Sequence, residues 1–420
     1  MNYTISIYWI LLVASAHLQA QNIFQWRGPD RSGVYDETGL LSDWKKEGPD
    51  LLWTAQGIGK GYSSASVTKR MIYTAGKKDT VEYITAIDHQ GQIQWQLRYG
   101  LAGRQAYPET RCIPTVEGNR IYLISGRGEV TCIDAARRKK MWSVAAYEKF
   151  EGKHETWEIA ESPLVVDDKV IYTPGGYKTT MVALDKHTGR TVWMSESLHD
   201  STAYVSPLLI QLDHRKIITN VTANHLFGVD AADGKMLWKY KYADIDRPTW
   251  HPRAPIINCN TPVYDNGRIF VTSGYDHVGA MFQLSDDGSR IEFVWKAPAL
   301  DTHHGGVVHV GGYIYGSNWL SNSKGNWVCL DWQTGNVMYE KEWQTKGSII
   351  AADGMLYCYD ERRGNIALVK ATPEDFEIVS IFRVMHGTGP HWAHPVIQDG
   401  VLYVRHGDVL MAYDIRRDKL

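Results

Sequence analysis

Ala183-Leu184-Asp185-Lys186-His187-Thr188-Gly189, followed by Trp193, is one copy of a phrase that recurs along the chain. Each copy has a small residue, an apolar residue, an aspartate, a polar turn and then an aromatic residue. The other copies end at Trp95, Trp142, Trp238 and Tyr339, and two degenerate copies end at Trp295 and Phe382. These aromatics follow one another at intervals of about 45 residues, with one longer interval before Trp295. Strand-like repeats of this length are typical of a radial β-propeller, in which each repeat forms one blade.

The residue types of the phrase explain the local structure that it predicts. Short alternating runs rich in β-branched and aromatic residues precede the aspartates, as at residues 120–124 and 216–219, and such runs form strands. We expect Asp185 to cap a hairpin turn and Gly189 to take the positive φ that closes it. The aromatic residue then lies on the outer strand and packs into the next blade. We therefore interpret these tryptophans as core residues.

Eight candidate innermost strands give the number of blades. Several begin with Ser-Pro or Thr-Pro, and proline is tolerated at a strand start because it lacks an N–H group. The starts are residues 62–65, 110–114, 160–163, 204–207, 258–262, 303–306, 346–349 and 392–395. The last repeat ends before its aromatic, and residues 49–53 can supply the missing outer strand. We predict an all-β, eight-bladed β-propeller of four-stranded antiparallel blades, closed by the strand around Trp53 so that no sheet edge remains at the join.

The composition excludes several classes of protein. The chain has 420 residues, of which 44% are hydrophobic, and a formal net charge of −2, so nothing favours nucleic acid or an anionic membrane as a partner. The five cysteines include no adjacent pair and no Cys-x-x-Cys motif, which excludes a disulfide framework, a zinc ribbon and a c-type haem attachment site. One bridge, between Cys112 and Cys132 of the same blade, stays open. We expect no membrane span, because no long uninterrupted apolar run follows the N-terminal region.

The N-terminal residues have the pattern of an export signal. The apolar run at residues 5–14 precedes Ala16-His17-Leu18-Gln19-Ala20, which fits a signal-peptidase site, although no positive residue stands before the run. No cysteine near that site is available for a lipid anchor. We predict a signal peptide over residues 1–20, an N-terminal extension over 21–48 and a single propeller over 49–420. The mature protein is expected to be periplasmic or secreted.

With these repeats, eight blades and an export signal, the chain resembles the pyrroloquinoline-quinone (PQQ) repeat superfamily. That superfamily contains quinoprotein alcohol dehydrogenases and the outer-membrane assembly scaffold of the BamB type. A secreted branch labelled PQQ-binding-like, or polyvinyl-alcohol-dehydrogenase-like, resembles this chain at Phe24-Gln25-Trp26-Arg27-Gly28-Pro29-Asp30-Arg31-Ser32-Gly33 and Gly59-Lys60-Gly61-Tyr62-Ser63-Ser64. The chain departs from the methanol-oxidising enzymes, which place two adjacent cysteines against the quinone, and from the scaffold, which has a lipid-anchoring cysteine. The resemblance implies the fold more strongly than an activity.

Residues at the eight inner-strand starts are expected to converge at one mouth of the central channel. A gathering of titratable side chains in one concavity is the usual signal of a binding or catalytic site. The ring comprises Ser64, Arg111, Glu161, Tyr204, Asn258, Asn260, His303, His304, Lys346, His391 and His394.

Cofactor binding is the first role that this ring supports. The resemblance implies PQQ and Ca²⁺ as cofactors. The planar guanidinium of Arg111 suits a carboxylate or a quinone oxygen. Glu161 with Asn258 or Asn260 offers hard oxygen ligands for Ca²⁺, and quinoproteins use a Glu of the third blade in this way. The other residues assigned to the cofactor are Ser64, Tyr204 and His394.

Catalysis is the second role. His303 or His304 would remove a proton from a substrate hydroxyl, because imidazole titrates near neutral pH. Lys346 would stabilise a developing alkoxide or orient a carboxylate. Consecutive side chains point to opposite faces of a strand, so we expect at most one of the two histidines to face the channel and the pair to be a poor metal chelate.

Three long loops are expected on the same face, at residues 96–109, 143–159 and 239–257. Their aromatic side chains suit stacking on a sugar ring or an apolar ligand, or packing of a lid. These loops carry Tyr107, Tyr147, Trp157, Trp250 and His251.

Three functions remain open at this point. The first is an exported PQQ- and Ca²⁺-dependent dehydrogenase of alcohols or sugars. The second is a non-catalytic binding or assembly scaffold with a protein partner. The third is a quinone-independent, carbohydrate-active propeller enzyme. The first and third place a small-molecule or carbohydrate ligand in the central funnel.

Overall fold

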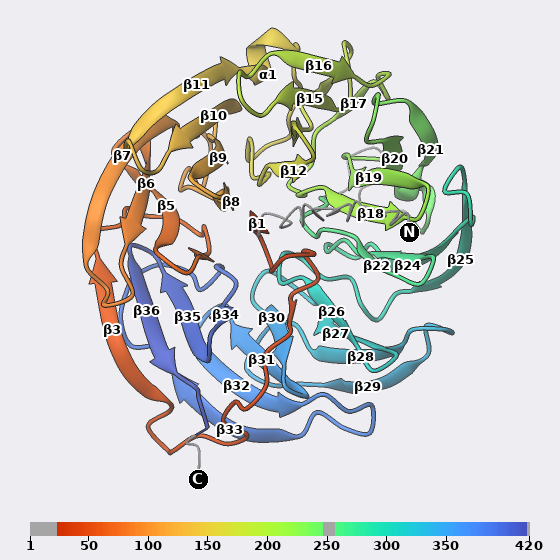
Figure 1. Ribbon diagram of the computed structural model, residues 1–420. Coiled ribbons are helices and arrows are strands. Elements are labelled where there is room, and N and C mark those ends of the chain that lie inside the picture. Colours follow the sequence, from red (N-terminus) through yellow and green to blue (C-terminus); the bar gives the residue numbers. More distant parts are fainter. Residues whose placement is uncertain (1–22, 247–256, 418–420) are drawn as a thin grey trace, which may run out of the picture.

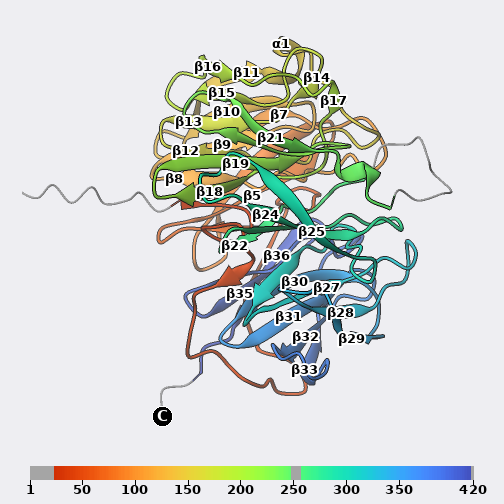
Figure 2. The same ribbon diagram turned by 90° about the vertical axis from the view of Figure 1, so that its right-hand side faces the viewer.

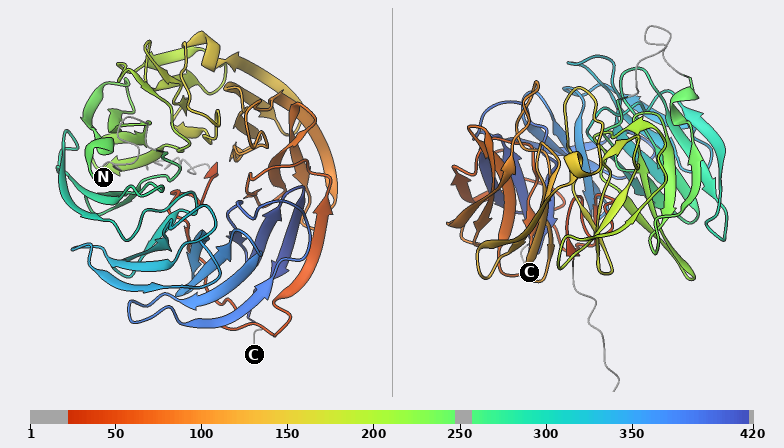
Figure 3. Two further views of the ribbon diagram at one scale, coloured as in Figure 1. Left: turned by 180° about the vertical axis from the view of Figure 1, so that it is seen from behind. Right: turned by 90° about the horizontal axis from the view of Figure 1, so that it is seen from above.

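The computed structural model describes residues 23–246 and 257–417, which form a closed ring of eight blades around a central axis (Figure 1). Figure 2 shows the ring from its rim, and Figure 3 shows it from behind and from above. Each blade is a twisted antiparallel sheet whose first strand lies nearest the axis and whose last strand lies at the rim. The predicted all-β, eight-bladed propeller is confirmed.

The blades follow one another in chain order. Blade 1 contains β4 (Ser66–Val67), β5 (Ile72–Lys78), β6 (Val81–Ile87) and β7 (Ile93–Leu101), and blade 2 contains β8 (Thr115–Glu117), β9 (Arg120–Ile124), β10 (Glu129–Asp134) and β11 (Lys139–Ala145). Blade 3 contains β12 (Leu164–Val166), β13 (Lys169–Tyr172), β15 (Val182–Asp185) and β16 (Thr191–Met194), and blade 4 contains β18 (Leu208–Leu212), β19 (Arg215–Val221), β20 (Leu226–Asp230) and β21 (Met236–Tyr240). Blade 5 contains β22 (Val263–Asp265), β23 (Arg268–Val271), β24 (Gly279–Leu284) and β25 (Ile291–Ala297), and blade 6 contains β26 (Val307–Val310), β27 (Tyr313–Ser317), β28 (Trp327–Asp331) and β29 (Val337–Lys341). Blade 7 contains β30 (Gly347–Ala352), β31 (Met355–Asp360), β32 (Asn365–Lys370) and β33 (Ile378–Arg383), and blade 8 contains β34 (Val396–Gln398), β35 (Val401–His406), β36 (Val409–Asp414) and β3 (Asp50–Gln56).

Few elements lie outside the blades. A small two-stranded sheet pairs β14 (Gly175–Gly176) with β17 (Asp200–Ser201), and the short helices are α1 (Ala146–Lys149) and a 3-10 turn (Tyr242–Asp244). Within the two described ranges, no helix has the length and apolar character needed to cross a bilayer. The predicted signal peptide lies outside the described residues.

The ring closes with a strand from the start of the chain, as the sequence predicts. Strand β3 pairs antiparallel with β36, and Trp53 lies opposite Ala412. The last blade thus combines three strands from the C-terminal end with one from the N-terminal region. This pairing leaves no open sheet edge between the first and last blades.

The recurrent tryptophans fasten each blade to the next one. The Nε1 atom of Trp142 on β11 donates a hydrogen bond to the carbonyl of Lys186 in the following blade, at 3.1 Å. Gly189 of the same turn has a φ of +72°, and a Cβ there would lie 2.8 Å from Cε3 of Trp142. The turn is capped by Asp185, whose Oδ1 accepts from the N–H and the hydroxyl of Thr188. Equivalent pairs at other junctions are Trp53 with Gly91, Trp193 with Gly234 and Trp295 with Gly335.

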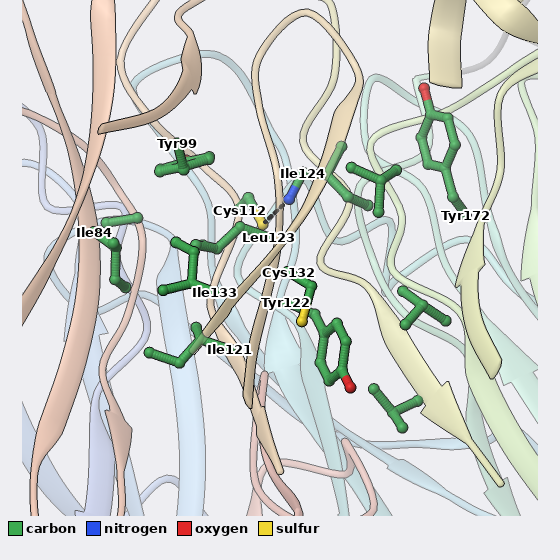
Figure 4. Close-up of a cluster of buried hydrophobic side chains, with 14 of the residues drawn as sticks. Ile84, Tyr99, Cys112, Ile121, Tyr122, Leu123, Ile124, Cys132, Ile133 and Tyr172 are labelled. Atoms are coloured by element: carbon green, nitrogen blue, oxygen red, sulfur yellow. Dashed lines mark hydrogen bonds between the residues drawn. The ribbon is translucent and has the colours of Figure 1, made fainter. Parts of the chain in front are cut away.

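The apolar core lies between neighbouring blades. Figure 4 shows one such cluster, in which side chains of the first three blades pack together. Cys112 belongs to it, and its sulfur accepts the N–H of Ile124 at 3.2 Å. All five cysteines are free thiols, so the bridge between Cys112 and Cys132 is not formed. The cysteines act as small buried residues.

The chain before β3 crosses the middle of the ring, which the repeat pattern does not predict. Strand β1 (Ile23–Phe24) pairs with β8 of blade 2, and β2 (Val34–Tyr35) pairs in parallel with β30 of blade 7 (Figure 1). We call residues 23–35 the central segment. It lies at the middle of the ring and joins blade 2 to blade 7, which are separated by blades 8 and 1.

Two buried arginines hold the central segment in place. Arg31 donates to the carbonyls of Pro163 and Pro207, at 2.7 and 2.8 Å, which lie just before the inner strands of blades 3 and 4. Arg27 donates to the carbonyls of Val307 and Ile349, at 2.6 and 3.1 Å, in blades 6 and 7. Backbone carbonyls satisfy these buried guanidinium groups, so the segment is an integral part of the fold.

Candidate functional site: an aromatic cavity at the channel mouth

The predicted inner-strand starts form the mouth of the channel, although most of them precede the strands. For example, β8 begins at Thr115, after residues 110–114, and β26 begins at Val307, after residues 303–306. These segments surround a cavity of about 330 Å³. The cavity is lined by Trp26, Tyr62, Tyr107, Arg111, Ile113, Trp157, Ala160, Tyr204, Ser206, Cys259, Tyr275, His303, His304, Asn322, Glu361, Trp392 and His394.

Aromatic rings form most of the wall. The ring of Trp392 lies 4.8 Å from that of Tyr62 and 5.1 Å from that of Tyr107, measured between centroids. On another part of the wall, the ring centroids of Trp157 and Tyr204 lie 5.6 Å apart. Tyr62, Tyr204 and Trp392 precede the inner strands of blades 1, 4 and 8, whereas Tyr107 and Trp157 lie in two of the predicted long loops. All five aromatic residues line the same cavity.

Arg111 ties two of the aromatic loops to the wall. Its guanidinium donates to the carbonyl of Trp157 at 2.7 Å and to the carbonyl of Tyr107. Burial lowers the pKa of Arg111, and nearby tyrosines and carboxylates partly offset this effect. The predicted cofactor arginine thus lies at the cavity, where it positions the loops that carry Tyr107 and Trp157.

The floor of the cavity belongs to the central segment. Trp26 donates from Nε1 to the hydroxyl of Thr261 at 3.1 Å, and its ring packs edge-on against His394 at 4.5 Å. His394 is bonded through Nδ1 to Arg27, at 2.9 Å, and through Nε2 to the carbonyl of His304, at 3.0 Å. Burial, with the charge of Arg27, holds the pKa of His394 well below its usual value. His394 therefore remains neutral and couples the floor to the wall.

A polar cluster occupies the side formed by blades 6 and 7. Glu361, in the turn between β31 and β32, lies with Oε2 3.2 Å from Nε2 of His304. Its other oxygen, Oε1, accepts from the Lys346 ammonium at 2.5 Å. Lys346 also donates to the carbonyls of residues 321 and 322, at 3.1 and 2.9 Å. Lys346 thus holds the carboxylate of Glu361 in place and does not line the cavity itself.

The expectation that His303 and His304 point to opposite sides is wrong. Residues 303–305 are bends before β26 and not part of a strand, so the two-residue alternation does not apply to them. Both side chains line the cavity, with ring centroids 4.4 Å apart. The pair is therefore available to a single ligand or ion.

The charge state of this cluster follows from its contacts. Burial alone raises the pKa of Glu361, but the hydrogen bond and charge of His304 and the charge of Lys346 outweigh it, so the pKa lies below its usual value. Burial, followed by the charges of His304 and Lys346, holds the pKa of His303 well below its usual value. Near neutral pH, Glu361 is ionised and His303 is neutral.

Other residues of the predicted ring face their own blades. Ser64 donates to the carbonyl of His394 at 2.8 Å, and Asn258 donates to the carbonyl of Thr222 at 2.8 Å. Asn260 donates to three backbone carbonyls, and its amide oxygen accepts the N–H of Gly306 at 3.0 Å. The ring of His391 stacks on that of His406. None of these four predicted residues lines the cavity formed by the described chain.

Glu161 is buried beneath the wall and does not line the cavity. Its carboxylate accepts the N–H of Thr173 at 3.1 Å. Burial raises its pKa to about 8, although Thr173 and Arg31 partly oppose this shift. In the metal-free protein, the Glu161 carboxyl group therefore holds its proton near neutral pH.

The residues of the cavity do not fit PQQ held with Ca²⁺. Ca²⁺ takes six to eight oxygen ligands, whereas an oxygen of Glu161 and the amide oxygen of Asn260 already accept backbone N–H groups. PQQ carries three carboxylates, and Arg111 is the single Lys or Arg side chain among the described lining residues. Two of its N–H groups are directed at backbone carbonyls. None of the three predicted oxygen donors, Glu161, Asn258 and Asn260, lines the cavity formed by the described residues.

Several lining residues were missed as site residues in the sequence. Glu361 lies in a hairpin turn, and Trp26 lies in a segment outside the repeats. Trp392 belongs to a predicted inner-strand start, and an aromatic residue at that position could have indicated a binding site. Of the predicted loop aromatics, Tyr107 and Trp157 line the cavity, whereas the ring of Tyr147 packs against that of His154. Trp250 and His251 lie outside the described residues.

Comparison with known proteins supports the fold assignment. Residues 80–345 match a family model described as outer membrane protein assembly factor BamB. No curated protein matches the sequence.

Solved structures share the fold at low sequence identity. BamB from Moraxella catarrhalis has 15% identity and a TM-score of 0.62, and the match covers 88% of this chain and 98% of that chain. Quinohemoprotein alcohol dehydrogenase from Comamonas testosteroni has 12% identity and a TM-score of 0.65, covering 94% and 80%. A europium-containing methanol dehydrogenase has 12% identity and a TM-score of 0.61, covering 92% and 90%. Likeness at these identities shows the fold alone. Since the family model spans more than half of the chain, the protein belongs to the PQQ-repeat β-propeller family described as outer membrane protein assembly factor BamB.

Proposed function

We propose that this protein is a periplasmic or secreted propeller that binds a small carbohydrate in the aromatic cavity, without PQQ. One observation carries this proposal: seven aromatic side chains and Arg111 surround a cavity of about 330 Å³. That volume lies within the range of about 300 to 1,000 Å³ that is typical of small-molecule sites. Export is supported by the apolar run at residues 5–14.

The chemistry of the wall favours a sugar over a purely apolar ligand. Aromatic faces pack against the apolar face of a sugar ring, while the hydroxyls need a few well-placed polar partners. His304, Glu361 and Asn322 supply such partners on one side of the cavity. Arg111 adds a positive charge, so we expect a uronic acid to bind more tightly than the corresponding neutral sugar.

A PQQ-dependent dehydrogenase is the alternative raised by the dehydrogenase structures of the same fold. It requires an anionic cofactor and a hard cation in the cavity. The donor set described above matches neither requirement. We therefore place catalysis with quinone second to sugar binding without it.

Calorimetric titration with glucose, glucuronic acid and cellobiose tests the proposal. Trp157→Ala removes one aromatic side chain from the cavity wall but keeps the backbone carbonyl to which Arg111 donates. We expect this variant to bind the preferred sugar about tenfold more weakly, since an aromatic contact contributes about 1 kcal/mol or more. Tyr177→Ala is the matched control, because Tyr177 is 70% exposed and lies outside the cavity lining. Equal affinity for both variants, or binding of none of the three sugars, would exclude carbohydrate binding at this wall.

An assembly scaffold is the second candidate, and the family match favours it. Apolar side chains are also exposed in adjacent pairs on the rim, such as Leu51 with Leu52 on β3 and Val337 with Met338 on β29. The double variant Leu51→Lys, Leu52→Lys should lose the binding of a protein partner that contacts the rim, whereas Trp157→Ala should retain this binding. Chemical cross-linking in cells of both variants separates a rim scaffold from a cavity receptor.

A further inference from the structure

His303, His304 and Glu361 form a compact group of metal-ligating side chains on the cavity wall. One ligand atom from each residue can be chosen so that all three lie within 4.8 Å of one another. The histidines precede β26 in blade 6, and Glu361 follows β31 in blade 7. The group therefore joins two neighbouring blades at the mouth of the channel.

His303 has a ring nitrogen ready to accept a partner. Its Nδ1 atom is buried and makes no hydrogen bond to any described residue. Buried polar atoms in native proteins are nearly always paired, so this unpaired nitrogen is available to a ligand in the cavity. His304 presents Nε2 toward the same carboxylate, at 3.2 Å from Oε2 of Glu361.

Lys346 fixes the position of the Glu361 carboxylate. Its ammonium binds Oε1 of Glu361 and two backbone carbonyls, which accounts for its three N–H donors. Oε2 is then left for the side that faces the histidines. Hydrogen-bonded partners of this kind orient metal ligands in proteins. The ammonium also repels a cation, so we expect reversible rather than permanent metal binding.

We infer that His303, His304 and Glu361 bind a first-row divalent transition-metal ion, such as Zn²⁺, with its remaining coordination positions open to the cavity. Two imidazoles and one carboxylate suit these ions, whereas Ca²⁺ and Mg²⁺ prefer oxygen ligands alone. Three protein ligands with an open position are typical of catalytic rather than structural zinc sites. Metal–ligand bonds of about 2.1 Å require the donor atoms to approach one another by roughly 1 Å when the ion binds.

The inference rests on the proposed function in one respect: the open positions would bind a hydroxyl of the sugar in the cavity. The metal site itself is tested without any sugar. Binding of Co²⁺ to the full chain, purified without metal, is followed by its visible absorption, and Zn²⁺ content after dialysis is measured by mass spectrometry. His303→Gln is the main variant because it leaves the ion pair of Lys346 with Glu361 intact. Glu361→Gln is a second variant, and its folding is checked by circular dichroism.

We expect one Co²⁺ per wild-type chain, with binding weakened more than about 100-fold in His303→Gln, beyond the loss usual for an outer-shell partner. His199→Gln, which changes an exposed histidine, is expected to bind as wild type does. Trp157→Ala is expected to keep the metal while it loses sugar affinity, so failure of sugar binding and failure of the metal site are distinguishable. No Co²⁺ binding by the wild type, or equal binding by His303→Gln, would overturn the inference.

Discussion

Gly189→Ala tests the way in which the blades are joined. Gly189 has a φ of +72°, and an added Cβ would lie 2.8 Å from Cε3 and 2.9 Å from Cδ2 of Trp142. That indole donates to the carbonyl of Lys186, so any displacement of the ring also strains this bond between blades 2 and 3. Gly354→Ala is a matched control, because Gly354 has a φ of +73° and a Cβ there would meet no atom within 4 Å.

The two substitutions share one energetic cost and differ in another. A non-glycine residue at positive φ costs about 1 to 2 kcal/mol at either site. Only Gly189→Ala adds a clash with a packed ring, for which overpacking costs about 1 to 3 kcal/mol. Loss of the indole hydrogen bond adds about 1 kcal/mol. We therefore expect Gly189→Ala to be about 2 to 4 kcal/mol less stable than Gly354→Ala.

Equilibrium unfolding in urea, followed by circular dichroism, measures this difference. A Trp142→Leu background removes the ring, and we expect most of the extra cost of Gly189→Ala to disappear there. Equal free energies of unfolding for the two glycine variants would refute the role of the ring. An extra cost that persists in the Trp142→Leu background would also refute it.

Three further predictions follow from buried polar groups. Arg31→Met leaves the carbonyls of Pro163 and Pro207 without their donor, so we expect the free energy of unfolding in urea to fall by about 3 kcal/mol or more. The control Arg137→Met, at an exposed site, should change the free energy of unfolding by less than about 0.5 kcal/mol. Burial raises the pKa of Glu161 from 4.5 to about 8, so the folded state binds more protons between these values and stability falls as the pH rises through them. Glu161→Gln should reduce this fall in thermal scans at pH 5 and pH 8, and an unchanged pH dependence would contradict the assignment. Arg111→Lys loses the paired bonds to the carbonyls of Tyr107 and Trp157, so sugar affinity measured by calorimetry should drop about tenfold with little change in melting temperature.

Features of the fold that depend on local contacts were predictable from the sequence. Asp185, Thr188 and Gly189 form a turn whose hydrogen bonds lie within five residues, and the residue types alone specify it. The closing strand around Trp53 was predictable because the last repeat lacks its outer strand. Regular spacing of such local units is sufficient to predict a closed ring.

The direction of side chains at the channel mouth was less predictable. Glu161 and Asn260 lie at the expected strand starts, but backbone N–H groups of their own and neighbouring blades bind them away from the cavity. The rule of alternating side chains failed at His303 and His304 because bends replace the strand there. Position along a repeat thus predicts proximity to the mouth, whereas local backbone geometry decides exposure to the cavity.

Long-range parts of the site had the weakest signal. Trp26 reaches the cavity because the central segment crosses the ring, an arrangement held by Arg27 and Arg31 that no repeat encodes. Glu361 lies in a hairpin turn, where an acidic residue ordinarily indicates an exposed position. Lys346 lies 15 residues before Glu361 in the same blade, whereas His304 precedes the inner strand of blade 6, so the packing of neighbouring blades brings the three side chains together.

Titration calorimetry with PQQ and with glucuronic acid, each with and without Ca²⁺, tests the central claim most directly. We expect the wild-type protein to bind glucuronic acid, Trp157→Ala to weaken this binding, and Ca²⁺ to have no effect on either ligand. We expect no PQQ binding at concentrations up to about a millimolar, which corresponds to roughly −4 kcal/mol. Tight, Ca²⁺-dependent binding of PQQ that is lost in Glu161→Ala would contradict the account and identify the cavity as a quinone site.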